Sequence, residues 1–201
     1  MSDEKDAGTP TTAPVRTLDQ GALKALAHPL RVQIYDILSQ QGAQTASSLA
    51  ELTGESSGST SYHLRALAKH DLIREVEGRG SARERWWERP RGGVSFTNPD
   101  ALKTPSGRAA SQVVMTEFLG RRHQQLMRYI TQSMNAPALP SEDEALISTS
   151  TVPLTPAQSA ELIRRLQAVV DEFSDAYRGQ ESPDARLFNI RADVFPLPDE
   201  A

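Results

Sequence analysis

The chain contains no cysteine, which excludes disulfide bonds and thiolate metal sites. It has no apolar run near the roughly 18 residues that a membrane-spanning helix requires. The opening residues, MSDEKDAGTPTTAP, are acidic and polar, unlike a signal peptide. Aromatic residues make up only 5% of the 201 positions, yet 38% are hydrophobic, which is enough for a buried core. These features predict a cytoplasmic protein without a membrane segment.

The chain also lacks the overall positive charge of a uniformly basic nucleic-acid binder, because its net charge is −4. This charge is unevenly spread. Residues 1–19 carry −2, residues 20–91 carry +2, residues 92–140 carry +3 and residues 141–201 carry −7. A basic middle and an acidic tail suggest that only part of the surface meets phosphate, although an acidic tail can also simply aid solubility.

The rest of the chain is organised around residues 45–72, TASSLAELTGESSGSTSYHLRALAKHDL. This stretch predicts two short helices joined by a tight turn. Thr45 is suited to cap the first helix, and Gly54 to end it in a left-handed conformation. Ser56 or Ser57 is suited to cap the second helix, whose leucines form an apolar face. Helix, glycine-containing turn and helix is the helix-turn-helix pattern.

The outer face of the second helix is the candidate DNA-reading surface. Its small hydroxyl side chains would let the helix lie deep in a major groove. Arg65 is expected to bind phosphate or a base, whereas Tyr62 could equally stack on the core or contact a sugar or a thymine methyl. Thr60 is expected to face the protein instead. The candidate DNA-binding residues of this segment are Ser56, Ser57, Ser59, Ser61, Tyr62, Arg65 and Lys69.

Residues 72–90 predict a β-hairpin, because two extended runs flank a glycine-rich tip. Arg79 and Arg83 lie near this tip and are candidates for contact with the sugar-phosphate backbone or the minor groove. For Arg85 and Arg89 we favour ion pairs instead. One of the two adjacent tryptophans is expected to anchor the hairpin to the helices.

The segments ALAHPLRVQIYDIL, TASSLAELTG and STSYHLRALAKHDLI, followed by the charged hairpin, resemble the ArsR-like winged helix-turn-helix transcriptional regulators. The resemblance covers about residues 18–90. It implies a homodimer on double-stranded DNA with an inverted-repeat operator, and repression as the usual role. Relatives usually have an apolar residue at the position of Thr60, so this chain departs from the pattern there.

The expected fold class is α+β and mainly α: a winged helix-turn-helix domain, a long helix and a small C-terminal strand-helix-strand unit. We expect a disordered tail at 1–16, the DNA-binding domain at 17–90, a linker at 91–105 and a dimerisation or effector-responsive region at 106–201. Within the domain, Thr17 and Gln20 suggest a capping box for the first helix.

The C-terminal region predicts two helices. An amphipathic pattern runs from Ser106 to Met134, and Thr155-Pro156 begins a second helix that ends near Arg178. The second helix carries apolar residues at alternating spacings of four and three, typical of a short coiled-coil seam. Alternating runs before and after it, LISTSTVPL and ARLFNIRADVFPLP, predict strands.

Other functions compete with DNA binding. Residues 54–58 match the G-x-S-x-G motif of hydrolases, but helical periodicity precedes them where that motif needs a strand. His63 and His70 lie two helical turns apart, too far to share one metal ion. We therefore expect no catalytic residue, no metal site and no cofactor.

Two further alternatives concern partners. The Met- and Phe-lined stripe of the long helix could hold a small-molecule effector, although such stripes more often form a core or a dimer interface. A winged helix that binds only proteins is the other alternative. Arg65, Arg79 and Arg83 argue against it.

Overall fold

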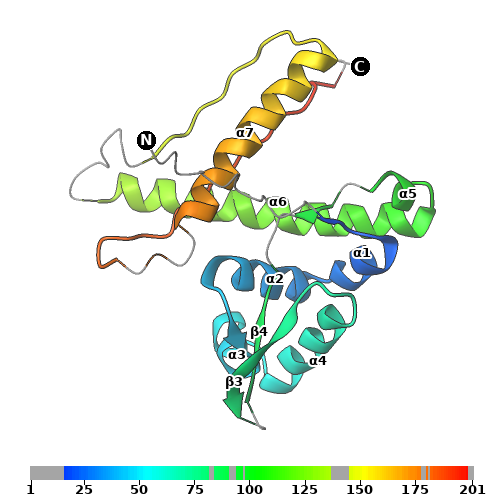
Figure 1. Ribbon diagram of the computed structural model, residues 1–201, viewed down its shortest axis with the longest axis vertical. Helices are drawn as coiled ribbons and strands as arrows, with labels where there is room; N and C mark the ends of the chain where they lie inside the picture. The colour runs from blue at the N-terminus through cyan, green and yellow to red at the C-terminus, as the bar shows by residue number, and fades with distance from the viewer. Residues whose placement is uncertain are drawn as a thin grey trace, which may run out of the picture. The chain divides into compact units, whose positions relative to one another are not determined.

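Figure 1 shows a computed structural model of the chain. The structure describes residues 16–81, 84–90, 94–96, 98–136, 145–177, 180 and 182–198. The chain divides into two compact units. One unit spans Ala13–Ser141, and the other comprises Glu142–Ala201 with Met1–Thr12.

The first unit is mostly helical and holds the predicted helix-turn-helix near its N-terminus. Its elements are β1 (Arg16–Thr17), α1 (Gln20–Leu26), α2 (Pro29–Gln41), β2 (Gln44–Thr45), α3 (Ala46–Thr53), α4 (Ser57–Ala68), β3 (Arg74–Ser81), β4 (Glu84–Glu88), β5 (Val94–Ser95), α5 (Pro99–Leu102) and α6 (Pro105–Met134). The long helix α6 therefore confirms the amphipathic pattern read from the sequence, with one more residue at its start.

Local side-chain caps define the helix-turn-helix. The Thr45 hydroxyl oxygen accepts a hydrogen bond from the Ser48 amide at 3.1 Å, which begins α3. Gly54 ends the helix in the left-handed region at φ 73°. The Ser56 hydroxyl oxygen then accepts from the Ser59 amide at 3.1 Å and begins α4. Because each boundary has its own cap, the turn is fixed by local sequence.

The hydrophobic core lies between α1, α2, α3 and α4, and α6 packs on α1 and α2 (Figure 1). Leu23, Ile34, Leu49, Leu64 and Leu67 are completely buried there. Burying leucine-sized side chains gives about 1.5–3 kcal/mol each, so this core fixes the orientation of α4.

The hairpin closes one side of this core. Strands β2, β4 and β3 form a three-stranded sheet in that order, and both pairings are antiparallel. Ile73 and Trp87 are buried and join the hairpin to the helices. The predicted tryptophan anchor is thus confirmed, with Trp87 in that role.

A second, parallel pair joins β1 to β5, with Arg16 opposite Val94. The Asn98 side chain accepts from two amides at the start of α5 and donates to the Leu18 carbonyl at 2.8 Å. The described residues between 94 and 102, where the sequence suggests a linker, are therefore packed elements of the unit. Of the expected disordered tail 1–16, only Arg16 falls within the described residues.

The predicted capping box at Thr17 is wrong. Thr17 lies in β1, and Asp19 caps α1 by accepting from the Ala22 amide at 2.7 Å. The Gln20 side chain instead donates to the Thr104 and Ser106 hydroxyl oxygens at the start of α6. A strand partner 78 positions away, at Ser95, takes Thr17 out of the local cap.

In the second unit, helix α7 spans Pro156–Tyr177 and confirms the predicted helix. Thr155 and Gln158 form its capping box. The two predicted strands are wrong, because residues 145–154 and 185–198 are irregular in the structure. A strand needs a partner to satisfy its backbone groups, and the described residues of this unit provide none. None of the helices described here is both long and apolar enough to cross a membrane.

The junction of α5 and α6 yields a prediction for stability. A Cβ at Gly107 would lie 2.0 Å from the Ala101 carbonyl oxygen, whereas a Cβ at Gly120 on the same helix would meet nothing within 4 Å. We expect Gly107→Ala to lower the free energy of unfolding by about 1–3 kcal/mol through overpacking. Gly120→Ala should raise it by about 0.5–1 kcal/mol, since alanine favours the helix. Urea unfolding of both variants measures this, and equal effects would contradict the packing.

Candidate nucleic-acid interface

Helix α4 has a buried face and an exposed face. Leu64 and Leu67 are completely buried, whereas Tyr62 is 64% exposed. Arg65 and Lys69 are also exposed, and their spacing of four residues places them on one face, a turn apart. Ser56 and Ser57 are exposed, and Ser59 and Ser61 are partly buried. The side chains predicted to bind DNA from this helix and its N-cap are therefore exposed to solvent to different degrees.

The hydroxyl groups of α4 divide between the fold and the open face. Ser56 uses its oxygen as the N-cap. Thr60 is completely buried and donates to the Ala46 carbonyl of α3 at 2.7 Å, which confirms that it faces the protein. The departure from an apolar residue at this position is thus explained by a hydrogen bond between the two helices. Ser57 and Ser61 show no such bond within the described residues.

Arg65 and Lys69 form no ion pair with any residue that the structure describes. The turn that follows α4 is held by a different cation. Arg16 of β1 donates to the Asp71 and His70 carbonyl oxygens at 2.6 and 2.9 Å. A positive charge at a helix C-terminus is favourable because of the helix dipole. Because Arg65 and Lys69 are exposed and have no ion-pair partner among the described residues, both are available for an external anion.

The hairpin has an irregular register that places Arg79 over an aromatic ring. Glu75 lies opposite Trp87 and Gly80 opposite Arg85, so four residues of β3 face the single residue Trp86. Gly80 allows this bulge because its φ is +100° and a Cβ would lie 2.2 Å from the Glu84 carbonyl oxygen. No other residue type fits there without movement of the backbone.

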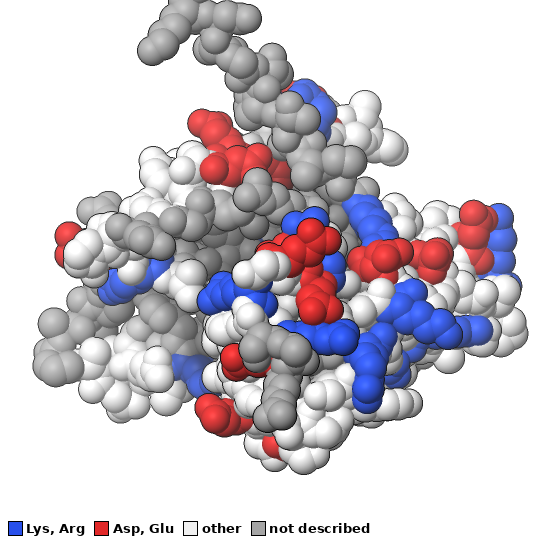
Figure 2. Space-filling model, turned by 60° about the horizontal axis from the view of Figure 1, so that its bottom comes forward, with Lys and Arg blue, Asp and Glu red and all other residues white. Residues whose placement is uncertain are grey.

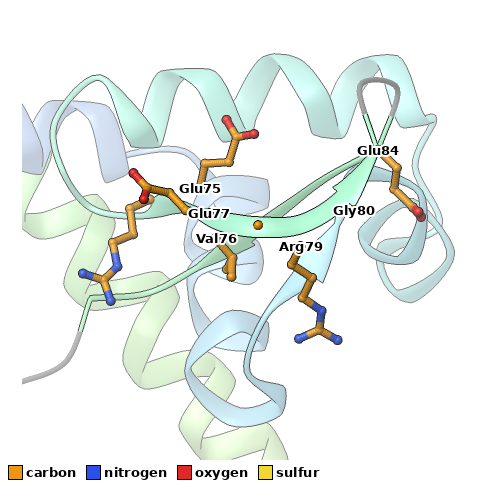
Figure 3. A pocket seen from close by; sticks show the side chains of 8 residues that line it. Glu75, Val76, Glu77, Arg79, Gly80 and Glu84 are labelled. Carbon is orange, nitrogen blue, oxygen red and sulfur yellow. The ribbon is translucent and has the colours of Figure 1, made fainter.

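Figure 3 shows Arg79 extending from the hairpin on the same side as Val76. The Arg79 guanidinium carbon lies 3.7 Å from the centre of the Trp86 ring. This cation–π contact holds the side chain in place while leaving it exposed. An open hollow on this part of the hairpin is lined by residues 74–80 and Glu84. Arg83, the other predicted hairpin contact, lies outside the described residues.

Other cations of the hairpin have protein partners. Arg85 forms an ion pair with Glu75 at 3.4 Å, as predicted, and Arg74 pairs with Glu88 at 2.7 Å. Arg89 donates to the Ser39 hydroxyl at 3.1 Å and lies over the Tyr35 ring of α2. These contacts distinguish Arg79 from its neighbours. In Figure 2 basic and acidic side chains are interleaved, with the largest group of basic side chains in the right half of this face.

A cluster of His28, Arg31 and His63 joins the start of α2 to α4, next to Tyr62. The His28 and His63 rings lie 4.6 Å apart between centroids. His28 caps α2 by accepting from the Leu30 amide at 3.2 Å. Burial lowers the pKa of His63, and the nearby His28 and Arg31 lower it further, against a weaker opposing effect of Glu55. His63 is thus favoured in its neutral form.

Arg31 is a residue that sequence reasoning missed. Its Nε and the His63 Nδ1 are buried without a hydrogen-bond partner among the described residues. The sequence places Arg31 only on a scaffold helix, two residues after the Pro29 that begins it. Its proximity to α4 depends on packing, so local sequence carries no signal for it. Arg31 is partly exposed and lies near the exposed Tyr62.

The competing sites find no support in the described residues. Helix α3 precedes Gly54, where a nucleophile elbow needs a strand. The described residues contain no group of three metal-ligating side chains.

An open, polar hollow lies between α2 and α6, beside the ion pair of Asp36 and Arg121 at 3.4 Å.

Residues 26–76 match the family model described as a helix-turn-helix domain. The chain therefore contains a helix-turn-helix domain, a type typical of DNA-binding regulators. No curated protein matches the chain significantly. Among solved structures, the crystal structure of RV1404 from Mycobacterium tuberculosis is 20% identical, with 83% of this chain and 86% of that chain covered and a TM-score of 0.30. A likeness at that level carries no argument about fold or function.

The lowered pKa of His63 predicts a pH dependence of stability. Unfolded histidine binds protons below about pH 6.5, whereas the folded protein resists protonation there. We therefore expect the free energy of unfolding to fall as the pH drops from about 7 to about 5. His63→Gln should flatten this fall, and the exposed His123→Gln on α6 is the control. Urea unfolding at several pH values measures it, and an unchanged profile in His63→Gln would exclude this role.

Proposed function

We propose that the protein is a sequence-specific, ArsR-like transcriptional regulator that binds double-stranded DNA as a homodimer. The observation that carries this proposal is the open face of α4. It combines small hydroxyl side chains with two cations that have no ion-pair partner among the described residues, Arg65 and Lys69. A helix of this kind suits a major groove, and beside it lies a hairpin with an oriented arginine.

In this proposal the segment from Ser57 to Lys69 enters the major groove. Its small side chains allow close approach, Arg65 binds phosphate or a base edge, and Tyr62 contacts a sugar or a thymine methyl. Arg79 and Arg83 of the hairpin reach the flanking backbone or minor groove. The proposed DNA-binding residues are Ser56, Ser57, Ser59, Ser61, Tyr62, Arg65, Lys69, Arg79 and Arg83.

A homodimer would present two α4 helices related by a two-fold axis. The matching operator is an inverted repeat whose half-sites lie about one helical turn, roughly 34–36 Å, or a small multiple apart. Occupying a promoter at such a site would repress transcription. The region 106–201 would supply the dimer contact or respond to an effector.

Selection of bound fragments from the source genome tests the proposal. We expect saturable binding to a palindromic site, far tighter than to unrelated DNA of the same length. If only weak, salt-sensitive and sequence-independent binding is found, the proposal of a sequence-specific regulator is wrong. A winged helix that binds only proteins would show no binding at all.

The side chains can be tested on the selected fragment. Arg65→Ala and Arg79→Ala should each weaken binding and each reduce the slope of log affinity against log salt by about one, if each neutralises one phosphate. Arg85→Ala is the matched control, because Arg85 already pairs with Glu75. Its slope should stay the same. Unchanged slopes for Arg65→Ala and Arg79→Ala would place both residues off the DNA.

The Trp86 ring gives an independent prediction. If Trp86 acts by holding Arg79, Trp86→Ala should weaken DNA binding by about 0.5–1 kcal/mol, less than Arg79→Ala does. In the Arg79→Ala background the same change should have no further effect. A double-mutant cycle by fluorescence anisotropy measures the coupling. Fully additive losses would show that Trp86 does not act through Arg79.

A further inference from the structure

Helix α7 exposes a continuous apolar stripe. Leu162 and Leu166 are 36% and 37% exposed, and Val169 and Phe173 are 55% and 54% exposed. None of the residues of this helix is buried among the residues that the structure describes. A helix of 22 residues depends on the burial of an apolar face for most of its stability. The stripe therefore needs a surface to cover it.

The spacing of the stripe fits a partner helix. Its core positions alternate in steps of four and three residues and are Leu162, Leu166, Val169, Phe173 and Ala176. Ile163, Val170 and Tyr177 widen the stripe on one side. Arg165 and Glu172 border it on the other side, seven residues apart. This arrangement is that of a short coiled coil of two to three heptads.

We propose that α7 pairs in antiparallel orientation with α7 of a second copy of the chain. This deepens the homodimer of the proposed function by naming its contact. Leu166 lies against Val169 of the partner subunit, and Leu162 lies against Phe173 of the partner subunit. A two-fold axis near the middle of the helix repeats both contacts and closes the dimer.

Charge complementarity selects this partner and orientation. In the antiparallel pair the border positions of one helix face those of the other, so Arg165 meets Glu172 of the partner subunit twice, once on each side of the axis. In a parallel pair Arg165 would lie near Val170 of the partner subunit, and no ion pair would form across the seam. Arg165 pairs with Glu161 on its own helix, but its side chain stays 74% exposed and can reach a partner subunit.

Side-chain size agrees with the same orientation. The largest core residue, Phe173, faces a leucine, and Leu166 faces the smaller valine, so the largest and smallest side chains stand in separate layers that each contain a leucine. A parallel pair would place the two Phe173 rings in one layer and the two Val169 side chains in another. Uneven layers pack less well. The sequence of α7 is therefore self-complementary in one orientation.

Cysteine cross-linking tests the pairing in the full chain, which has no native cysteine. Chains with Leu166→Cys and chains with Val169→Cys are refolded together with different tags and oxidised. We expect the mixed disulfide to predominate over either homodimeric disulfide. A parallel pair would instead cross-link each variant with itself. Homodimeric disulfides alone, or no disulfide, would overturn the proposal. Arg164→Cys, on the far side of α7, is the control.

Charge reversal provides a second test, by sedimentation in the absence of DNA. Arg165→Glu and Glu172→Arg should each raise the dimer dissociation constant by about tenfold, because like charges then face each other. The double variant should restore dimerisation. Arg164→Glu removes an arginine from the same Glu161 but lies off the seam, so it should leave the dimer intact. A monomeric wild type, or a dimer indifferent to these changes, would overturn the proposal.

These outcomes are separable from the proposed function. Sedimentation and cross-linking report on α7 without DNA, whereas DNA titration reports on α4. If α7 pairs but the protein shows no specific DNA binding, the proposed regulatory function is wrong and the α7 interface stands. If specific DNA binding persists in a protein whose α7 does not pair, the proposed α7 interface is wrong and the proposed regulatory function stands.

Discussion

The burial of Leu64 and Leu67 is the constraint on which the proposed interface depends. Both side chains are completely enclosed by the helical core, so α4 cannot rotate about its axis without exposing them. Thr60 adds a hydrogen bond to α3 that fixes the helix against its neighbour. The face of α4 opposite these residues therefore points outward, and the exposure of Arg65 follows from the buried leucines one residue before it and two residues after it. Core packing and this hydrogen bond together orient the site.

The hairpin extends the same principle with two adjacent tryptophans. Trp87 is buried and joins the sheet to the core. Trp86 lies on the other face of the strand, and its ring contacts the Arg79 guanidinium. Alternation along β4 places the two rings on opposite faces. The bulge at Gly80 brings the arginine over the second ring. A rigid anchor and an oriented cation thus come from neighbouring positions in the sequence.

Much of this could be predicted from local sequence, and the failures share a cause. The caps at Thr45, Gly54 and Ser56, and helices α6 and α7, depend on nearby residues and are confirmed. The capping box at Thr17 is wrong because a distant strand pairs with it, and the C-terminal strands are wrong because they lack partners in the described chain. Arg31 and the contact of Arg79 with Trp86 arise from packing and register. DNA contact itself stays a prediction for every residue named.

Hydrogen exchange of the full chain with and without the selected DNA fragment tests the central claim most directly. The account predicts slower exchange in the peptides that cover α4 and the β3–β4 hairpin when DNA is bound, because a helix in the groove loses access to solvent. Helix α7 should exchange at the same rate with and without DNA, because the dimer is present in both samples. Specific binding without protection of α4 would contradict the account and place the DNA on another surface.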